Sequence, residues 1–387
     1  MTAATPVTLT VAQAGAQSLA SGTVGHALLA IERATNGAGD WATAQRLIKQ
    51  ATAGPVDAAP HCALYYGAPA IAFLLHAATV DGRDRYPAAR QALDRHVRRL
   101  TRARLTNATD RLRDGRPATF AEYDLFTGLI GIGGLLLHHA PGSSEMGDVL
   151  RYAVRLAGPR YHDGMHIPGW WVEHDPDPLY PTPGGHANLG MAHGAAGLLA
   201  LLAHASRHGR HVEGQAEAIR WLCAWFDQWR QDSAHGAWWP QWITGEQVRT
   251  GRPAHDGPGR PSWCYGAAGI ARAQQLAAIA TGDRTRKTSA ELALAACLTS
   301  PQRDRLTDPG LCHGYAGLYQ TAYRAAADTT NPVIADQLPA LAALITNAEH
   351  GNDIGFLSGN TGVALTTETI RTGQPPHTRW DACLLIA

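Results

Sequence analysis

A short glycine pattern recurs seven times along this 387-residue chain, and it limits the possible folds more than any other feature. Each copy reads Gly-x-x-Gly, or Gly-x-x-Ala in one case, and leads into an apolar helical run. In chain order the copies are Gly22/Gly25, Gly67/Ala70, Gly128/Gly131, Gly194/Gly197, Gly266/Gly269, Gly314/Gly317 and Gly359/Gly362. Such a repeat predicts one supersecondary unit used many times. A single Gly-x-x-Gly indicates only close helix packing, but seven copies in register do not arise by chance.

Longer segments with apolar residues at three-and-four spacing lie between the copies, at 83–105, 212–230, 287–298 and 333–349. This spacing predicts amphipathic helices, whereas the glycine-led helices are apolar nearly all round and are expected to be buried. The alternation predicts an all-α protein, an α/α toroid in which seven inner helices are surrounded by outer helices. We expect a single domain over residues 1–387. The departure to Ala70 in copy two is expected to affect packing and not chemistry.

Two segments interrupt the alternation, at 160–187 and 232–261, and both are rich in Pro, Gly and Trp. Long loops within a compact domain are often functional. We expect these segments to form loop insertions at the rim of the toroid, with a little β-structure. Residues 237–244 are a candidate strand of a hairpin.

The bulk properties exclude several functions. The net charge is +1, so no electrostatic footprint for nucleic acid or a membrane surface is expected. The chain has no stretch of about 18 apolar residues, so no transmembrane segment is expected. Residues 1–6 lack the basic and apolar regions of a signal peptide, which predicts a cytoplasmic protein. The six cysteines contain no C-x-x-C pair, and a disulfide framework is not expected.

The residues just before the first glycine of each copy carry the chemistry. One position before it stand Ser21, Tyr66, Thr127, His193, Tyr265, His313 and Ser358. Two positions before it, copies five and six have Cys264 and Cys312. If all inner helices start at the same end, these positions surround one mouth of the toroid. His193, Cys264, Cys312 and His313 would then converge there.

Two thiolates and one imidazole suit Zn²⁺. Cys264, Cys312 and His313 are therefore predicted to bind one zinc ion per chain. Three protein ligands leave a fourth position open, which is typical of a catalytic site. We expect such a site to add thiols to an electrophile. The remaining cysteines are expected to be buried and structural, and they are Cys62, Cys223, Cys297 and Cys383.

The motifs Ala192-His193-Gly194, Trp263-Cys264-Tyr265-Gly266 and Cys312-His313-Gly314, in this order, resemble those of the lanthionine synthetase C-like family. The resemblance extends from Ser18 to Leu385. Bacterial members of that family are lanthipeptide cyclases, and the family fold is an α/α toroid with zinc at its mouth.

The resemblance implies roles for individual residues. Cys264, Cys312 and His313 match the zinc ligands, and His193 matches an acid/base histidine. Among the other functional positions, Asp124 matches an aspartate, Arg260 matches an arginine, and Trp263 and Tyr265 flank the zinc ligand between them.

The activity implied is formation of (methyl)lanthionine rings. The thiol of a peptide Cys, activated by zinc, would attack the β-carbon of dehydroalanine or dehydrobutyrine in the same peptide. His193 would protonate the resulting enolate or take up the thiol proton, Arg260 would stabilise the enolate oxygen, and Asp124 would orient His193 or a water. The implied partners are a dehydrated precursor peptide with leader and core, a separate dehydratase and a transporter, in a biosynthetic complex that could bring the protein to a membrane.

Two alternatives stay open. A prenyltransferase-like α/α barrel also activates thiols with zinc, although its ligand set includes an aspartate and it needs a partner subunit. A relative of the cyclase family that binds glutathione or has a regulatory role would be non-enzymatic. Prenylation of a thiol peptide would support the first alternative, and neighbouring genes for a dehydratase and a precursor would favour the cyclase.

Overall fold

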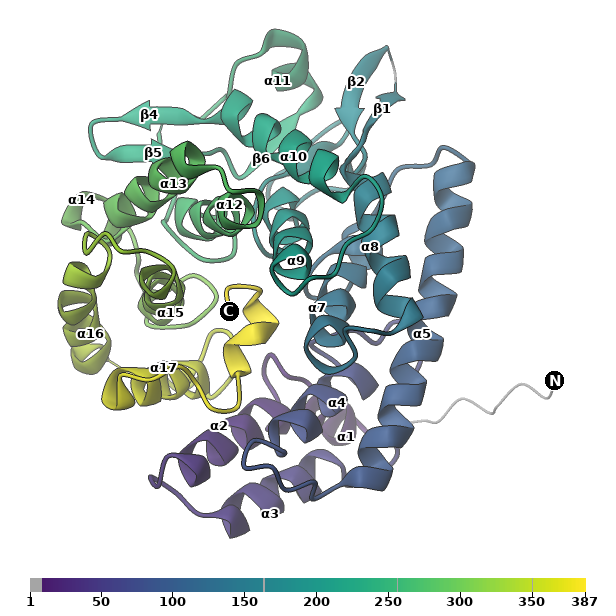
Figure 1. The fold of residues 1–387 in the computed structure, drawn as a ribbon, viewed down its shortest axis with the longest axis vertical. Coiled ribbons are helices and arrows are strands. Elements are labelled where there is room, and N and C mark those ends of the chain that lie inside the picture. Colours follow the sequence, from purple (N-terminus) through teal and green to yellow (C-terminus); the bar gives the residue numbers. More distant parts are fainter. Residues whose placement is uncertain (1–8, 163, 256, 350) are drawn as a thin grey trace.

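The computed structural model describes residues 9–162, 164–255, 257–349 and 351–387. Residues 1–6, where no signal peptide is expected, lie outside this range, as do Asp163 and Asp256 of the two loop segments. Within the described residues, the repeat leads seven inner helices: α2 (Thr23–Thr35), α4 (Ala68–Ala77), α7 (Leu129–His139), α9 (Ala195–Arg207), α12 (Ala267–Thr281), α15 (Tyr315–Ala327) and α17 (Asn360–Thr372). Each packs on the next, and α17 packs on α2, which closes the ring (Figure 1). The predicted α/α toroid is confirmed.

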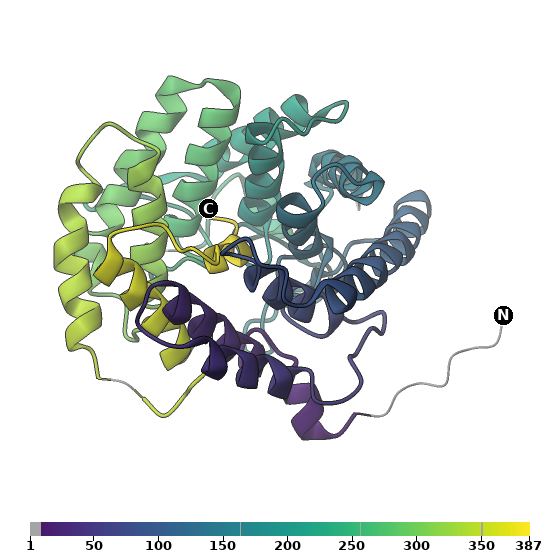
Figure 2. The same cartoon turned by 60° about the horizontal axis from the view of Figure 1, so that its bottom comes forward.

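Amphipathic helices form the outer layer: α3 (Trp41–Ala51), α5 (Pro87–Arg113), α8 (Ser144–Ala157), α10 (Gln215–Trp229), α13 (Arg284–Cys297) and α16 (Leu338–Asn347). Their starts follow ordinary capping chemistry, because Asp40, Ser143 and Asp283 each accept a hydrogen bond from the third residue of the helix that follows. Figure 2 shows the same ring tilted, with the C-terminal segment inside it. Short helices complete the chain: α1 (Val11–Ala16), α6 (Phe120–Tyr123), α11 (Gly245–Thr250), α14 (Ser300–Arg303), η1 (Ala335–Gln337) and η2 (Trp380–Leu384).

The strands come from the segments that interrupt the helical alternation. β1 (Pro159–His162) pairs with β2 (Met165–Pro168), β3 (His186–Asn188) with β6 (Trp242–Thr244), and β4 (Gln231–Ser233) with β5 (Gly236–Trp238), all antiparallel. The candidate strand at 237–244 is in fact two strands with different partners. Pro240 lies between them and has no N–H to donate to a ladder.

The second glycine of the pattern is needed because the chain turns back onto the helix. A Cβ at Gly317 would lie 1.8 Å from the carbonyl oxygen of Leu311, and one at Gly269 would lie 2.0 Å from that of Trp263. Copy two has Ala70 instead, and there the first glycine differs: Gly67 has a φ of 69°, whereas the other six first glycines have negative φ. Copy two therefore reaches the helix through a turn of another shape.

Replacing Gly317 with alanine is expected to lower the free energy of unfolding by at least about 2 kcal/mol, because Leu311 or α15 must move to admit the methyl group. Gly15→Ala is the matched control, since nothing lies within 4 Å of a Cβ there. Denaturant unfolding of both variants measures the difference. Equal stabilities would contradict this account of the repeat.

Backbone hydrogen bonds join six of the seven neighbouring pairs of turns before the inner helices. The N–H groups of Ala192, Cys264, Cys312 and Leu357 donate to the carbonyls of Cys264, Cys312, Leu357 and Ala20, at 3.1, 3.2, 2.8 and 3.0 Å respectively. Leu125 N–H donates to Ala192 O at 3.1 Å and Leu19 N–H to Tyr65 O at 2.9 Å. Between copies two and three the rings of Tyr65 and Phe126 meet edge to face at 4.7 Å. These contacts place all seven turns at one end of the toroid.

The C-terminal segment occupies the middle of the ring, and its main chain is held from several sides (Figure 1). Tyr65 Oη donates to Cys383 O at 3.0 Å, and Arg272 Nη2 donates to Ile386 O at 2.8 Å. His204 Nε2 lies 3.1 Å from Leu385 O. All three side chains are buried. Their polar groups compensate for removing these carbonyls from water. None of the described helices has the length and apolar character needed to span a bilayer.

Candidate metal centre and acid–base pair

In each turn before an inner helix, some side chains point into the interior and others toward the mouth of the toroid. Three positions before the first glycine, every copy has an apolar side chain that is at most 1% exposed: Leu19, Leu64, Leu125, Met191, Trp263, Leu311 and Phe356. One position before it, all seven residues are exposed or half-buried. The position between them carries Cys264 and Cys312. The two cysteines therefore lie at the boundary between the core and the mouth.

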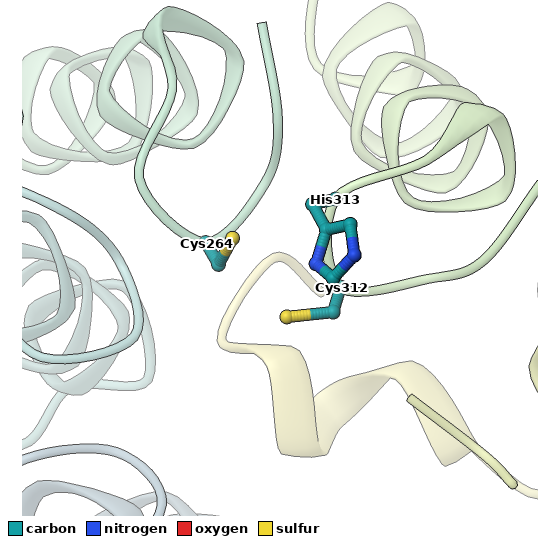
Figure 3. A group of neighbouring side chains, drawn as sticks. All are labelled: Cys264, Cys312 and His313. Carbon is teal, nitrogen blue, oxygen red and sulfur yellow. The ribbon is translucent and has the colours of Figure 1, made fainter. Parts of the chain in front are cut away.

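Cys264, Cys312 and His313 come together at the mouth. Each offers one ligand atom, and these atoms all lie within 4.8 Å of one another. Figure 3 shows the two turns facing each other, with Cys264 on one and Cys312 and His313 on the other. The backbone bond from Cys264 N–H to Cys312 O fixes the spacing of the two turns. Neighbouring residues would diverge in a regular helix, but the turn before Gly314 lets Cys312 and His313 both face Cys264.

The electrostatics of the group suit a cation. A hydrogen bond from Cys312, followed by contacts with His313 and Ser262, holds the pKa of Cys264 well below its usual value despite full burial. The pKa of Cys312 is raised by that same hydrogen bond and by burial. The pKa of His313 is raised, chiefly by its hydrogen bond to Cys264. The three side chains thus share protons among them, and a divalent cation can replace those protons. Two sulfurs and one imidazole nitrogen fit zinc, and the half-buried Cys312 and His313 leave one side open.

His193 and Asp124 form a tight pair. Nδ1 of His193 donates to Oδ2 of Asp124 at 2.5 Å, and the carboxylate side chain is only 1% exposed. Oδ1 of Asp124 accepts from the N–H and the hydroxyl of Thr127, at 2.6 and 2.9 Å. The carboxylate is therefore fixed on both oxygens. It holds the imidazole so that Nε2 is the nitrogen available for exchanging a proton at the mouth.

Aromatic rings surround His193. Phe120 stacks on the imidazole at 4.9 Å, Phe126 meets it edge to face at 5.2 Å, and Tyr265 lies 5.6 Å away. Burial is the main cause that raises the pKa of Tyr265, which stays protonated at neutral pH. Sequence reasoning missed Phe120 and Phe126. The only available signal was that Phe126 stands two residues before Gly128, the position of the cysteines in copies five and six.

Arg260 is exposed at the edge of the same mouth. Its positive charge is close enough to lower the pKa of both Cys312 and His313. Within the described part of the chain it forms neither an ion pair nor a side-chain hydrogen bond. The N–H groups of the guanidinium are thus available to a ligand beside the metal-ligating group.

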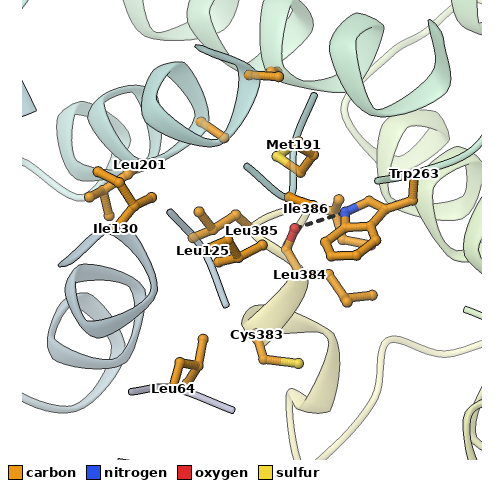
Figure 4. Close-up of a cluster of buried hydrophobic side chains, with 14 of the residues drawn as sticks. Leu64, Leu125, Ile130, Met191, Leu201, Trp263, Cys383, Leu384, Leu385 and Ile386 are labelled. Atoms are coloured by element: carbon orange, nitrogen blue, oxygen red, sulfur yellow. Dashed lines mark hydrogen bonds between the residues drawn. The ribbon is translucent and has the colours of Figure 1, made fainter. Parts of the chain in front are cut away.

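Trp263 lies on the other side of its turn. Its side chain is fully buried, and Nε1 donates to Leu384 O at 3.0 Å in the centre of the toroid (Figure 4). Trp263 therefore does not face the mouth as Tyr265 does. It anchors the turn that carries Cys264 to the C-terminal segment.

A second group, Asp57, His61 and Cys62, also has ligand atoms within 4.8 Å of one another. Here the carboxylate is already engaged: Oδ1 accepts from Ala59 N–H at 3.0 Å, and Oδ2 lies 3.1 Å from Tyr66 Oη and 3.2 Å from His61 Nε2. Burial raises the pKa of Cys62 to about 12. These contacts close the unusual turn of copy two, with Cys62 packed against Gly67.

Known proteins resemble this chain in both sequence and fold. The family model described as lanthionine synthetase C-like protein matches residues 13–385. The Nisin biosynthesis protein NisC of Lactococcus lactis subsp. lactis is 26% identical over 144 residues, which are 37% of this chain and 33% of that protein. The matched sequence thus spans a third of that curated relative. The solved structure of nisin cyclase is similar with a TM-score of 0.79 at 20% identity, over 96% of this chain and 92% of that one.

Proposed function

This chain belongs to the lanthionine synthetase C-like family, and we propose that it is a zinc-dependent lanthipeptide cyclase. The observation that supports this most is the convergence of Cys264, Cys312 and His313 at the mouth where the His193–Asp124 pair also lies. The proposed substrate is a precursor peptide already dehydrated by a separate enzyme. We place the reaction in the cytoplasm, where dehydratase and transporter would be the partners.

Zn²⁺ held by Cys264, Cys312 and His313 would lower the pKa of a substrate cysteine thiol and present it as a thiolate. The rest of the reaction falls to side chains of the chain itself. A C–S bond forms at the β-carbon of dehydroalanine or dehydrobutyrine, and the π electrons move onto the adjacent carbonyl as an enolate. His193 takes up the proton that the thiol loses and delivers it from Nε2 to the α-carbon, while Asp124 stabilises the charged form of the imidazole. The guanidinium of Arg260 donates to the enolate oxygen. Tyr265 bounds the space beside His193.

The test is incubation of the zinc-loaded protein with a peptide that contains dehydrated residues and free cysteines. Cyclisation leaves the mass unchanged, so rings are counted as thiols that no longer react with an alkylating reagent. We expect fewer alkylated thiols than in samples without protein or with a chelator. Alkylation equal to the protein-free sample would contradict the cyclase, and transfer of an isoprenoid from its diphosphate to the thiol would favour the prenyltransferase-like activity.

A further inference from the structure

Asp308 stands six residues before Gly314, and its side chain closes a turn that recurs in the repeat. Its Oδ1 accepts from Gly310 N–H at 2.9 Å. At the same position in copy four, Asn188 Oδ1 accepts from Gly190 N–H at 2.8 Å, and in copy seven Asp353 Oδ1 accepts from Gly355 N–H at 2.7 Å. The turn therefore needs an oxygen at this position but no charge, since asparagine forms it in copy four.

The second oxygen of Asp308 has a contact that the turn does not require. Oδ2 lies 3.5 Å from Nε2 of His313. In copy seven the corresponding rim residue is Ser358, which carries no imidazole. In copy four the rim residue is His193, but its carboxylate partner is Asp124 from another turn. Of the three copies with this turn, copy six combines the carboxylate and the imidazole in one turn.

This geometry divides the two nitrogens of His313. Asp308 does not belong to the group of metal-ligating atoms, and its carboxylate lies beside Nε2. Nδ1 is then the nitrogen left for the metal. A carboxylate on the far nitrogen of a ligating histidine fixes the tautomer and the ring orientation, and removing it typically weakens metal binding about 10- to 100-fold.

We infer that Asp308 is a positioning residue of the metal centre, which acts on zinc through the far nitrogen of His313. The inference rests on the proposed zinc site. It separates two tasks in one side chain: Oδ1 shapes the turn, and Oδ2 orients the ligand. Asparagine at this position keeps the first task and loses the second.

The experiment compares Asp308→Asn with Asp353→Asn, which makes the same change in a turn without a histidine. Zinc dissociation constants are measured by competition with a chromogenic chelator, and thermal melting of the zinc-free proteins checks the fold. We expect Asp308→Asn to bind zinc about 10- to 100-fold more weakly than wild type, with an unchanged melting temperature. Asp353→Asn should bind zinc as wild type does.

Asp308→Ala removes both tasks and distinguishes the explanations. If Asp308→Asn retains wild-type zinc affinity while Asp308→Ala loses it, the turn alone matters and the inference is wrong. Equal weakening in Asp308→Asn and Asp353→Asn would also overturn it, because the effect would then come from the scaffold. Failure of the wild-type protein to bind stoichiometric zinc would instead overturn the proposed zinc site itself.

Discussion

Replacing Cys264 with alanine should remove zinc and ring formation together. Cys264 supplies one of the three atoms of the metal-ligating group, and its two remaining partners, Cys312 and His313, cannot hold zinc tightly alone. Metal analysis of the purified variant should find close to zero zinc, against about one per chain in wild type, and cyclisation should fall to the rate without protein.

The matched control for this prediction is Cys223→Ala. Cys223 is buried in α10, and burial raises its pKa to about 11, as expected of a structural thiol. This variant should keep its zinc, although some stability is lost with the sulfur. Full zinc content in Cys264→Ala would exclude this residue as a ligand.

Replacing His193 with alanine should separate the two effects, with zinc retained and cyclisation lost. The imidazole is tied to Asp124 and not to the metal-ligating group, so its loss leaves the three ligands in place. Removing a general acid or base typically costs about 10²- to 10⁴-fold in rate. Zinc analysis and single-turnover cyclisation of a dehydrated peptide measure the two effects on the same sample.

The backbone conformation at residue 193 should be unchanged in His193→Ala. Its carbonyl accepts from Tyr123 Oη at 2.7 Å, a bond that does not involve the imidazole. Asp124→Asn is the companion variant, because it preserves the shape of the pair but removes the charge that stabilises a protonated His193. Wild-type rates in His193→Ala would show that the histidine is structural.

The fold could be predicted from the sequence because its scaffold depends on backbone geometry. The second glycines are required wherever the chain turns back onto a helix, and so they stand in the sequence at regular positions. The meeting of Cys264 with Cys312 and His313 could be predicted for the same reason. Equivalent positions of equivalent units lie at the same end of a ring, however far apart they are in the chain.

Features that break the repeat could not be predicted. Phe120 reaches His193 from α6, outside the glycine pattern, and no sequence pattern marks it. The C-terminal segment is held inside the ring by hydrogen bonds to its backbone carbonyls. Every residue has such a carbonyl, so the sequence gives no sign of these contacts. The two aromatic neighbours of Cys264 also look alike in sequence. Only the direction of each side chain shows that Trp263 is part of the core and Tyr265 part of the mouth.

The closed ring of inner helices also bears on how the protein unfolds. In an open solenoid each unit contacts only its neighbours, so the ends fray and the middle outlasts them. Here the turn of copy seven is bonded to the turn of copy one, and copies two and three pack through α4 and α7 and through Tyr65 and Phe126. No unit is therefore left at a free end from which fraying could start. We therefore expect one cooperative transition that involves all seven units. Zinc bound between copies five and six would then raise the melting temperature of the entire ring by mass action, including copies far from the metal.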